Sequence, residues 1–315
     1  MNDLNVSVII INYNSSAYTL KCVQSIIKHT SSQLSYQIVI VDNNSEKQDF
    51  DRLKALSENP KVKVLRSKFN LGFSGGHMLG VQFTEAPYYF FLNNDCLLLN
   101  DCLSILYSFC EQNKTVALCA PQLFSDKMNK VCSFDHFPTL TTKFFGTGAM
   151  RLFSKKNYPH KKQTYDEPLK VDTVSGSTLF VRANSFFEVG GFDTNYFLYS
   201  EEEDLALRLS KKHDDTFLIP EAQTQHFGGG STKKTLEIEK EFYISFLYFY
   251  RKNYGILSTQ VLKIYLFLKL SRKCFKHSKY KKLAFFVLFG ACLSNSLRHK
   301  QKGRTYEEYR SQSLL

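Results

Sequence analysis

Four consecutive carboxylates form the densest group of residues in this sequence that could perform acid–base chemistry. Glu201, Glu202, Glu203 and Asp204 follow the aromatic stretch Tyr196–Tyr199 and come directly before an apolar helical pattern. Carboxylates this close raise one another's pKa, which suits a general base, and the aromatic rings beside them suit a sugar pocket. A helix N-terminus favours the same residues through its dipole. The sequence leaves both interpretations open.

Two further positions have the chemistry of metal ligands. Asp95 follows the apolar segment Tyr88–Leu92 and the amides Asn93 and Asn94. A carboxylate at the exposed end of a strand can hold a divalent ion that bridges two phosphates, although the same residue can cap a helix. His226 begins the glycine-rich segment 226–231, which we expect to be a flexible loop, with Ser231 as a phosphate contact. A neutral imidazole is a common metal ligand, but a lone histidine is more often structural.

The first half of the chain alternates strand and helix patterns that could bring these groups together. The predicted strands are 6–11, 37–41, 62–65, 88–92 and 116–120, with helical patterns over 15–29, 49–57 and 72–83. This alternation predicts a doubly wound parallel sheet, in which ligands bind beyond the C-terminal ends of the strands. Polar clusters at 12–14, 42–45, 70–76 and 93–95 follow four of the strands, and we expect them to form one rim. Such residues also favour ordinary turns.

The second half of the chain is less regular. Residues 125–170 contain Pro138, Pro159 and Pro168, and predict a loop-rich insertion or lid. A strand region over 171–181, a short helix over 185–189, a helix over 205–212 and a strand over 216–219 follow. From residue 237 onward the pattern is helical, aromatic and basic.

The positive charge of the chain lies almost entirely in its last quarter. The formal net charge is +12, yet residues 1–228 hold 23 Lys and Arg against 24 Asp and Glu, whereas residues 229–315 hold 18 against 5. A near-neutral body with a basic tail suggests a soluble core that meets a polyanion. The longest uncharged apolar run, Leu283–Leu293, is shorter than the ~20 residues that a spanning helix needs. The tail is therefore predicted to be a core helix or a helix on an anionic membrane surface.

The eight cysteines give no sign of a metal or disulfide framework. None are spaced as C-x-x-C, and no histidine stands at zinc-ligand spacing. The first residues have no positive segment of a secretory signal. We therefore expect reduced, mostly buried cysteines and a cytoplasmic location. No groove-reading motif is present, so no nucleic acid partner is expected.

Seven motifs in a fixed order carry a resemblance to a known family. They are Ser7–Asn14, Val41–Ser45, Asn70–Gly76, Leu92–Asp95, Ser175–Ser177 before Arg182, Gly190–Asp193 with Tyr196–Leu209, and His226 with Ser231. Over roughly residues 5–255 the chain resembles the family 2 glycosyltransferases of the GT-A fold, in their rhamnosyltransferase-like branch. Two positions depart from the family pattern. His77-Met78 replaces the usual Asn-Asn, and Glu202 stands where the family has Asp.

The resemblance implies a role for each matching residue. The residues expected at the nucleotide sugar are Asn12, Tyr13, Asn14, Asp42, Asn70, Gly72, Gly75, Gly76 and Asn94. Asp95 and His226 are the implied ligands of Mg²⁺ or Mn²⁺. Glu202 is the implied catalytic base, with Glu201 as the other candidate.

The resulting hypothesis is an inverting, metal-dependent glycosyltransferase. It would transfer rhamnose or a hexose from a dTDP- or UDP-sugar to a hydroxyl of a lipid-linked glycan. The expected pathway is the biosynthesis of a bacterial surface polysaccharide (O-antigen or capsule). Residues 1–236 would form the GT-A domain. Residues 237–315 would form a helical region that associates with the inner face of the cell membrane. Either a monomer or an oligomer is compatible with these two regions. The alternatives are a non-catalytic membrane scaffold and a nucleotide-binding oxidoreductase. The oxidoreductase would want G-x-G-x-x-G after the first strand, where Asn12-Tyr13-Asn14-Ser15 stands.

Overall fold

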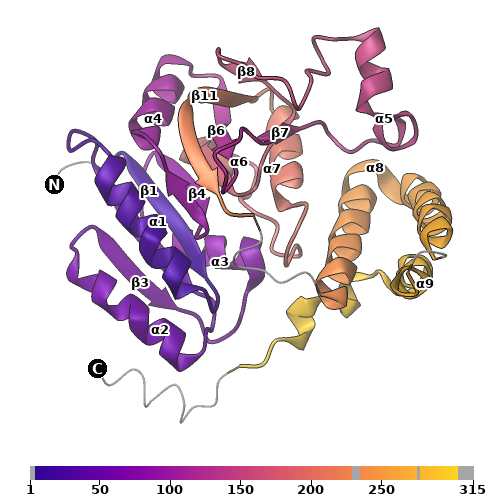
Figure 1. Cartoon of the computed structure of the whole chain (residues 1–315), viewed down its shortest axis with the longest axis horizontal. Coiled ribbons are helices and arrows are strands. Elements are labelled where there is room, and N and C mark those ends of the chain that lie inside the picture. The colour runs from indigo at the N-terminus through magenta and orange to yellow at the C-terminus, as the bar shows by residue number, and fades with distance from the viewer. Residues whose placement is uncertain (1–3, 229–234, 275–276, 304–315) are drawn as a thin grey trace.

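The N-terminal half of the computed structural model is a parallel sheet with alternating helices. The structure describes residues 4–228, 235–274 and 277–303. The elements in order are β1 (Val6–Asn12), α1 (Ser16–His29), β2 (Tyr36–Asp42), α2 (Lys47–Leu53), the 3₁₀ turn Lys54–Glu58, β3 (Val62–Arg66), α3 (Gly72–Val81) and β4 (Tyr88–Asn93). The four strands pair in parallel in the order β3-β2-β1-β4 (Figure 1). Their β-branched and aromatic residues are buried on both faces, as in parallel sheets generally.

Beyond β4 the sheet becomes mixed, and the prediction of an all-parallel sheet is wrong there. β10 (Thr178–Arg182) lies antiparallel between β4 and β6 (Val116–Phe124). β11 (Asp215–His226) runs parallel to β6, while β5 (Cys96–Leu98) and β8 (Leu169–Lys170) pair with β11 in antiparallel fashion. The simple alternation of strand and helix ends at β6, so the direction of later strands has no local signal in the sequence.

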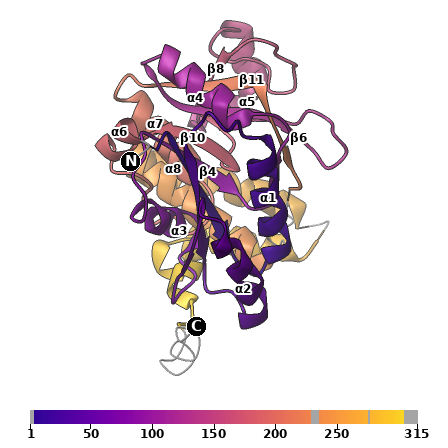
Figure 2. The same cartoon turned by 90° about the vertical axis from the view of Figure 1, so that its left-hand side faces the viewer.

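Helices cover the sheet on both faces (Figure 2). α1, α2 and α4 (Cys102–Gln112) pack on one face, and α3, α6 (Ala183–Glu188) and α7 (Glu201–Ser210) pack on the other. Neighbouring residues of β1 point to opposite sides, with Val8 and Ile10 in the first core and Ile9 in the second. Five of the eight cysteines are buried, and all eight are free.

Four segments differ from the sequence prediction. The supposed loop-rich insertion contains a helix, α5 (Leu140–Phe153), which Thr139 and Thr142 open with a capping box. The supposed strand region 171–181 is divided between β9 (Thr173–Val174), which pairs with β7 (Phe134–Asp135), and β10. The acidic run forms the first turn of α7 instead of preceding it, and β11 continues to His226, where a loop was expected.

The C-terminal helices form a third core with the body of the protein. α8 (Leu236–Lys273) bends at Gly255 and is followed by α9 (Lys279–Phe285), the π turn Phe286–Gly290 and the 3₁₀ turns Leu293–Asn295 and Leu297–Lys300. Tyr196 and Leu207 from the body share this core with α8 and α9. Among the described residues, no helix has the length and apolar character needed to cross a membrane.

One glycine of the predicted nucleotide motif is required by packing. Gly72 has a φ of +70°, and a Cβ at this position would lie 2.1 Å from the carbonyl oxygen of Phe197. The next amide, Phe73 N, donates to that same carbonyl at 2.8 Å. Gly72 therefore fixes the start of α3 against the segment that leads into α7.

We predict that Gly72→Ala lowers the free energy of unfolding by more than about 2 kcal/mol, because it combines left-handed strain with a backbone collision. Gly148→Ala in α5 is the matched control. Its added Cβ has open space around it, and helical Gly→Ala changes are mildly stabilising. Urea unfolding of both variants measures the difference. Equal stability of the two would contradict this account of Gly72.

Candidate active site

A buried polar network closes the C-terminal ends of β1 and β2. Asn12 Nδ2 lies 3.0 Å from both Asp42 Oδ1 and Ser45 Oγ, and 2.9 Å from Asp49 Oδ2. Asp42 Oδ2 forms an ion pair with Arg66 Nε at 3.2 Å. Burial raises the pKa of Asp42, and the hydrogen bonds from Ser45 and Asn12 together with Arg66 oppose this rise. The predicted residues Asn12 and Asp42 are thus brought together, with Asn12 engaged by protein groups.

Tyr13 and Asn14 lie at the exit of β1, above this network. Tyr13 is 44 % exposed and presents its ring to solvent. Asn14 adopts a left-handed φ of 50°, and its side-chain oxygen accepts a hydrogen bond from Glu46 N at 2.7 Å. These two residues therefore border the same rim as Asp42, and Tyr13 offers a free ring face to a planar ligand.

The glycine motif contacts the protein itself. Asn70 Oδ1 accepts a hydrogen bond from Gly72 N at 2.9 Å. A Cβ at Gly76 would lie 2.8 Å from Ile11 Cδ1 and 3.0 Å from Asn43 Nδ2, and one at Gly75 would lie 3.0 Å from Leu71 Cβ. The glycines let α3 pack closely on β1 and β2; their expected contact with the nucleotide sugar stays a prediction.

Asp95 and His226 meet where β5 pairs with the end of β11. Asp95 Oδ1 lies 3.3 Å from His226 Nε2, and Asp95 is buried while the imidazole is 23 % exposed. Apart from that imidazole, the buried Oδ1 has no hydrogen-bond partner within the described part of the chain. Asp95, Cys96 and His226 offer ligand atoms that all lie within 4.8 Å of one another.

The chemistry of this group fits a divalent cation. A carboxylate and an imidazole suit Mg²⁺ or Mn²⁺, with phosphates and water completing the shell. Burial raises the pKa of the Cys96 thiol well above its usual range, so it is a protonated and poor ligand for such hard ions. Asn94, in contrast, turns away from this position, because its Nδ2 donates to Ser15 Oγ at 2.6 Å and Thr19 Oγ1 at 2.9 Å. Ser231 and its glycine neighbours 229–230 lie outside the described residues.

The first turn of α7 places three carboxylates together. Burial raises the pKa of Glu201 to about 8 and that of Glu202 well above its usual range; burial also raises the pKa of Glu203. Glu201 Oε2 and Glu202 Oε2 are both buried without a hydrogen-bond partner among the residues described. The two preceding residues, Tyr199 and Ser200, have left-handed φ values of 76° and 64°. Strained backbone of this kind persists where the surroundings enforce it, often at ligand sites.

The Ser175–Ser177 turn connects the carboxylates to the metal-ligand pair. A Cβ at Gly176 would lie 3.1 Å from Glu202 Cδ, so the Glu202 carboxyl rests against this glycine. The next residue, Ser177, accepts hydrogen bonds through its carbonyl from Asn93 N at 2.9 Å and from Cys96 Sγ at 3.8 Å. Glu202 and Asp95 therefore belong to one neighbourhood although they are distant in sequence.

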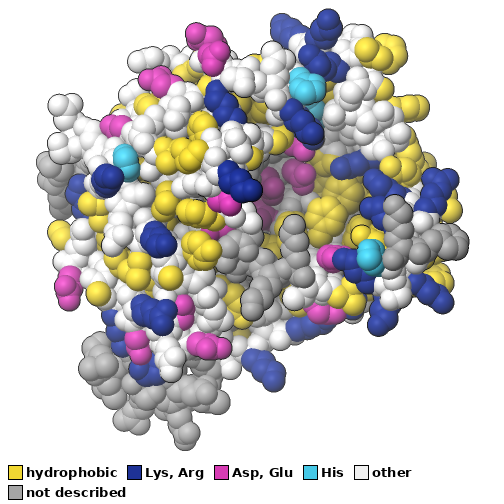
Figure 3. Space-filling view, viewed as in Figure 1, with side chains coloured by type: hydrophobic (Ala, Val, Ile, Leu, Met, Phe, Trp, Pro, Cys, Tyr) yellow, Lys and Arg dark blue, Asp and Glu magenta, His cyan; other side chains and the backbone are white. Residues whose placement is uncertain are grey.

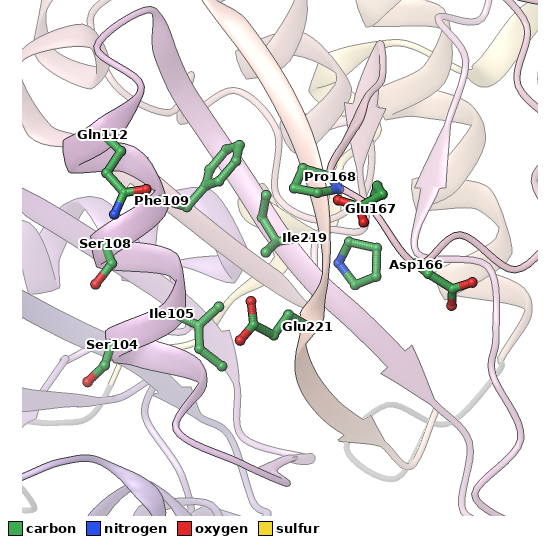
Figure 4. A pocket seen from close by; sticks show the side chains of 11 residues that line it. Ser104, Ile105, Ser108, Phe109, Gln112, Asp166, Glu167, Pro168, Ile219 and Glu221 are labelled. Atoms are coloured by element: carbon green, nitrogen blue, oxygen red, sulfur yellow. The ribbon is translucent and has the colours of Figure 1, made fainter.

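A hollow opens in the face of the molecule, with acidic side chains at its base and hydrophobic ones on the side of the C-terminal helices (Figure 3). A separate pocket of about 560 Å³ lies between α4, β11 and the segment 166–168 (Figure 4). None of the predicted site residues line it, and its charged lining residues are Asp166, Glu167 and Glu221. Because its charged side chains are all acidic, the pocket repels a diphosphate.

Sequence reasoning missed two residues of the polar network. Asp49 accepts hydrogen bonds from Ser16 N and Oγ as well as from Asn12. Although burial alone would raise the pKa of Asp49, the hydrogen bonds from Asn12 and Ser16 keep it below its usual range. Arg66 is the last residue of β3, so the rule that found the other strand ends could have identified it. Asp49 lies inside a predicted helix, where no such signal exists.

The sheet order and the site together define a glycosyltransferase with a GT-A-like fold. The chain belongs to glycosyl transferase family 2, whose family model matches residues 7–186. Rhamnosyltransferase WbbL of Escherichia coli (strain K12) is 26 % identical over 231 residues, which cover 70 % of this chain and 83 % of WbbL. N-acetylglucosaminyl-diphospho-decaprenol L-rhamnosyltransferase of Mycobacterium tuberculosis (strain ATCC 25618 / H37Rv) is 44 % identical over 62 residues, 20 % of each chain.

Two solved structures share the fold at low sequence identity. GalNAc-T7, crystallised with UDP, GalNAc and Mn²⁺, has a TM-score of 0.55 at 17 % identity, covering 80 % of this chain and 51 % of that one. Staphylococcus aureus TarS has a TM-score of 0.53 at 13 % identity, covering 78 % of this chain and 39 % of that one. The chain thus spans about half or less of these neighbours, and the likeness confirms the α/β GT-A fold predicted from the sequence.

The proximity of Asp95 and His226 generates a prediction about metal-dependent binding. We expect Asp95→Ala to abolish the metal-dependent part of the affinity for UDP or dTDP, and His226→Ala to weaken it, because each removes a ligand from the cation. Titration calorimetry with and without Mg²⁺ or Mn²⁺ measures this.

Two controls accompany the titrations. Glu58→Ala removes an exposed carboxylate in the 3₁₀ turn Lys54–Glu58, and Cys96→Ala removes the protonated thiol; both should keep the wild-type metal dependence. Full metal-dependent affinity in both the Asp95 and His226 variants would place the cation elsewhere.

Proposed function

We propose that this glycosyltransferase inverts the anomeric centre of its donor and transfers rhamnose or a hexose from a dTDP- or UDP-sugar to a glycan hydroxyl. The observation that carries the proposal is the Glu202 carboxyl, which has an unpartnered buried oxygen and rests on the turn that also contacts Asn93 and Cys96. The E. coli relative is named as a rhamnosyltransferase, which supports rhamnose. The mycobacterial relative is named for a diphospho-decaprenol acceptor, which supports a lipid-linked glycan in bacterial surface polysaccharide synthesis.

The donor would lie along the rim formed by β1, β2 and β5. The nucleobase stacks on the exposed ring of Tyr13, and Asp42, held by Asn12 and Arg66, accepts from a base or ribose donor group. Asp95 and His226 would hold Mg²⁺ or Mn²⁺ beside the diphosphate. When bound, the cation neutralises charge on the departing nucleoside diphosphate.

The transfer itself needs a base on the opposite side of the sugar. The acceptor oxygen forms a bond to the anomeric carbon as the bond from that carbon to the diphosphate oxygen breaks. Glu202 takes the hydroxyl proton, and the nucleoside diphosphate leaves with the bonding electrons. Of the two candidates for the base, Glu202 is half-buried and Glu201 is buried, so Glu202 is the more accessible to an acceptor. A non-catalytic scaffold would have no use for unpartnered buried carboxylates, whose burial is costly.

The proposal is tested by turnover across dTDP- and UDP-sugars with Mg²⁺ or Mn²⁺, comparing wild type with Glu202→Gln. The variant keeps the shape and removes the proton acceptor, so we expect kcat to fall at least ~10²-fold while donor affinity stays nearly unchanged. Glu221→Gln, in the pocket of Figure 4, is the matched control. Near-wild-type turnover in Glu202→Gln would move the role to Glu201 or overturn the mechanism.

The same assay has an expected pH dependence. A base must be ionised to accept a proton, and burial raises the pKa of Glu202 above its ordinary 4.5 and that of Glu201 to about 8. The rate should therefore fall on acidification, with the midpoint of kcat well above pH 4.5. A midpoint at or below the ordinary value would show that the base is not one of these buried carboxylates.

We further propose that the outer face of the C-terminal helices meets an anionic membrane, on the cytoplasmic side. Leu262, Leu266 and Leu270 turn inward to the third core, while other apolar side chains remain exposed. The most exposed are Leu257 (80 %), Ile264 (58 %) and Phe289 (81 %), together with Leu152 (84 %) and Phe153 (86 %) of α5. Exposed Lys and Arg side chains accompany them, and each contributes ~1 kcal/mol to the free energy of membrane binding when it lies near anionic headgroups.

We predict that the full-length protein floats with liposomes containing anionic lipid at low salt, and less so with neutral liposomes. A variant with four exposed charges removed, Arg272, Lys273, Lys281 and Lys282 each changed to Gln, should lose most of this binding. The matched control changes Lys21, Lys28, Lys127 and Lys130 to Gln and should still bind. Wild-type protein that ignores anionic liposomes would refute the membrane proposal and leave the sugar chemistry untouched.

A further inference from the structure

α5 places one lysine against the aromatic side of α8. Lys143 Nζ lies 4.7 Å from the centre of the Phe246 ring. On either side of this contact α5 is attached to α8, since the Tyr265 hydroxyl donates to the Lys143 carbonyl at 3.0 Å and the Phe144 ring meets Tyr265 at 5.0 Å. The position of the ammonium group is therefore defined by three contacts with α8.

The Lys143 ammonium has no counter-ion. Among the described residues, no carboxylate oxygen lies within 4.0 Å of Lys143 Nζ, and the group is half-buried. Glu203 and Asp135 attract it from further away, while Lys161 and Lys269 add positive charge nearby. Burial lowers the pKa of Lys143. A partly desolvated cation without a close partner is costly, and a bound anion offsets that cost.

One hydroxyl group of α8 also lacks a partner. Tyr250, one turn after Phe246 on α8, is fully buried, and its hydroxyl oxygen has no hydrogen-bond partner in the described part of the chain. The charge of Glu203 acts on Tyr250 as well as on Lys143, and Tyr250 and Lys143 both contact the Phe246 ring. Phe242, Phe246 and Tyr250 form a continuous row of rings along α8, with Tyr199 against Phe242. We call this row the aromatic wall.

The carboxylates of α7 act on both Lys143 and the aromatic wall, since the charge of Glu203 reaches Lys143 and Tyr250. The hollow in Figure 3 has acidic side chains at its base, hydrophobic ones on the α8 side, and Lys or Arg side chains around it. The donor diphosphate is already assigned to the other end of the site, at Asp95 and His226. Lys143 is therefore available to a second anion, and the acceptor is the remaining substrate.

We propose that Lys143 binds the phosphate that joins the acceptor sugar to its lipid, and so positions the acceptor hydroxyl over Glu202. This inference rests on the proposed function. A lysine ammonium suits phosphate, because it is a compact charge with three donors. Of the aromatic wall, Phe242 is 40 % exposed, and its ring offers an apolar surface for the first part of the lipid. An uncharged acceptor leaves Lys143 unpaired, so the residue selects phosphorylated acceptors.

Binding is measured first, without turnover. Full-length protein saturated with UDP and Mg²⁺, or with dTDP and Mg²⁺, is titrated with farnesyl diphosphate and with uncharged farnesol. We expect Lys143→Met to weaken farnesyl diphosphate binding about 10- to 100-fold and to leave farnesol binding unchanged. Lys143→Arg should retain affinity within a few-fold. Lys155→Met, an exposed lysine just after α5, is the matched control and should behave as wild type.

Kinetics then separate positioning from a structural role. With a diphosphate-linked glycan acceptor, Lys143→Met should raise KM at least ~10-fold and change kcat little, whereas KM for a neutral alkyl glycoside of the same sugar should not change. A melting temperature near wild type confirms that the fold is intact.

Each contrary result overturns the inference. If Lys143→Met leaves the affinity for farnesyl diphosphate unchanged, the inference is wrong. It is also wrong if this variant raises KM equally for the diphosphate-linked and the neutral acceptor. Weaker binding of UDP or dTDP in that variant would assign Lys143 to the donor instead. The binding titrations need no sugar transfer, so failure of wild type to turn over any nucleotide sugar would count against the proposed function alone.

Discussion

The buried carboxylate of Asp204 is the interaction on which the architecture of the site depends. Its oxygens accept hydrogen bonds from Arg208 Nε at 2.8 Å, Lys252 Nζ at 2.9 Å, Asn253 Nδ2 at 3.1 Å and the Tyr196 hydroxyl at 3.2 Å. Removing one partner of such a buried pair costs ~3–5 kcal/mol. These contacts join α7, the segment before it and α8 at one point. Because α7 carries the carboxylates and α8 the aromatic wall, Asp204 sets how these two groups lie relative to each other.

Helical periodicity explains why four adjacent carboxylates serve two purposes. Residues three apart lie on the same face of a helix, and Glu201 and Asp204 are both buried, whereas Glu202 and Glu203 are half-buried. The acidic run is therefore both a helix start, which the dipole favours, and a source of groups for chemistry. The two interpretations that the sequence left open describe different faces of the same turn.

Much of the fold was predictable from local patterns, and the rest depended on long-range pairing. The strands 6–12 and 36–42 and the helix between them follow directly from β-branched runs and helical spacing. The antiparallel direction of β10 was not predictable, because strand direction has no local signal in the sequence. The helix α5 was not predictable either, since its periodic signal is too weak to outweigh the prolines and lysines around it. Among the site residues, strand ends identified Asp42 and Asp95. Lys143 had no such marker, because its importance arises only when α5 docks on α8.

Both departures from the family pattern have explanations in packing. Glu202 is one methylene longer than the family's Asp, and the glycine at 176 provides space for its carboxyl, since a Cβ there would lie 3.1–3.4 Å from the Glu202 carboxyl atoms. His77 is buried against Phe73, Phe91 and Phe192, and burial lowers its pKa to about 3, so it packs as a neutral ring. The substitution at 77 thus belongs to the core under α3, whereas the substitution at 202 alters the reach of the proposed base.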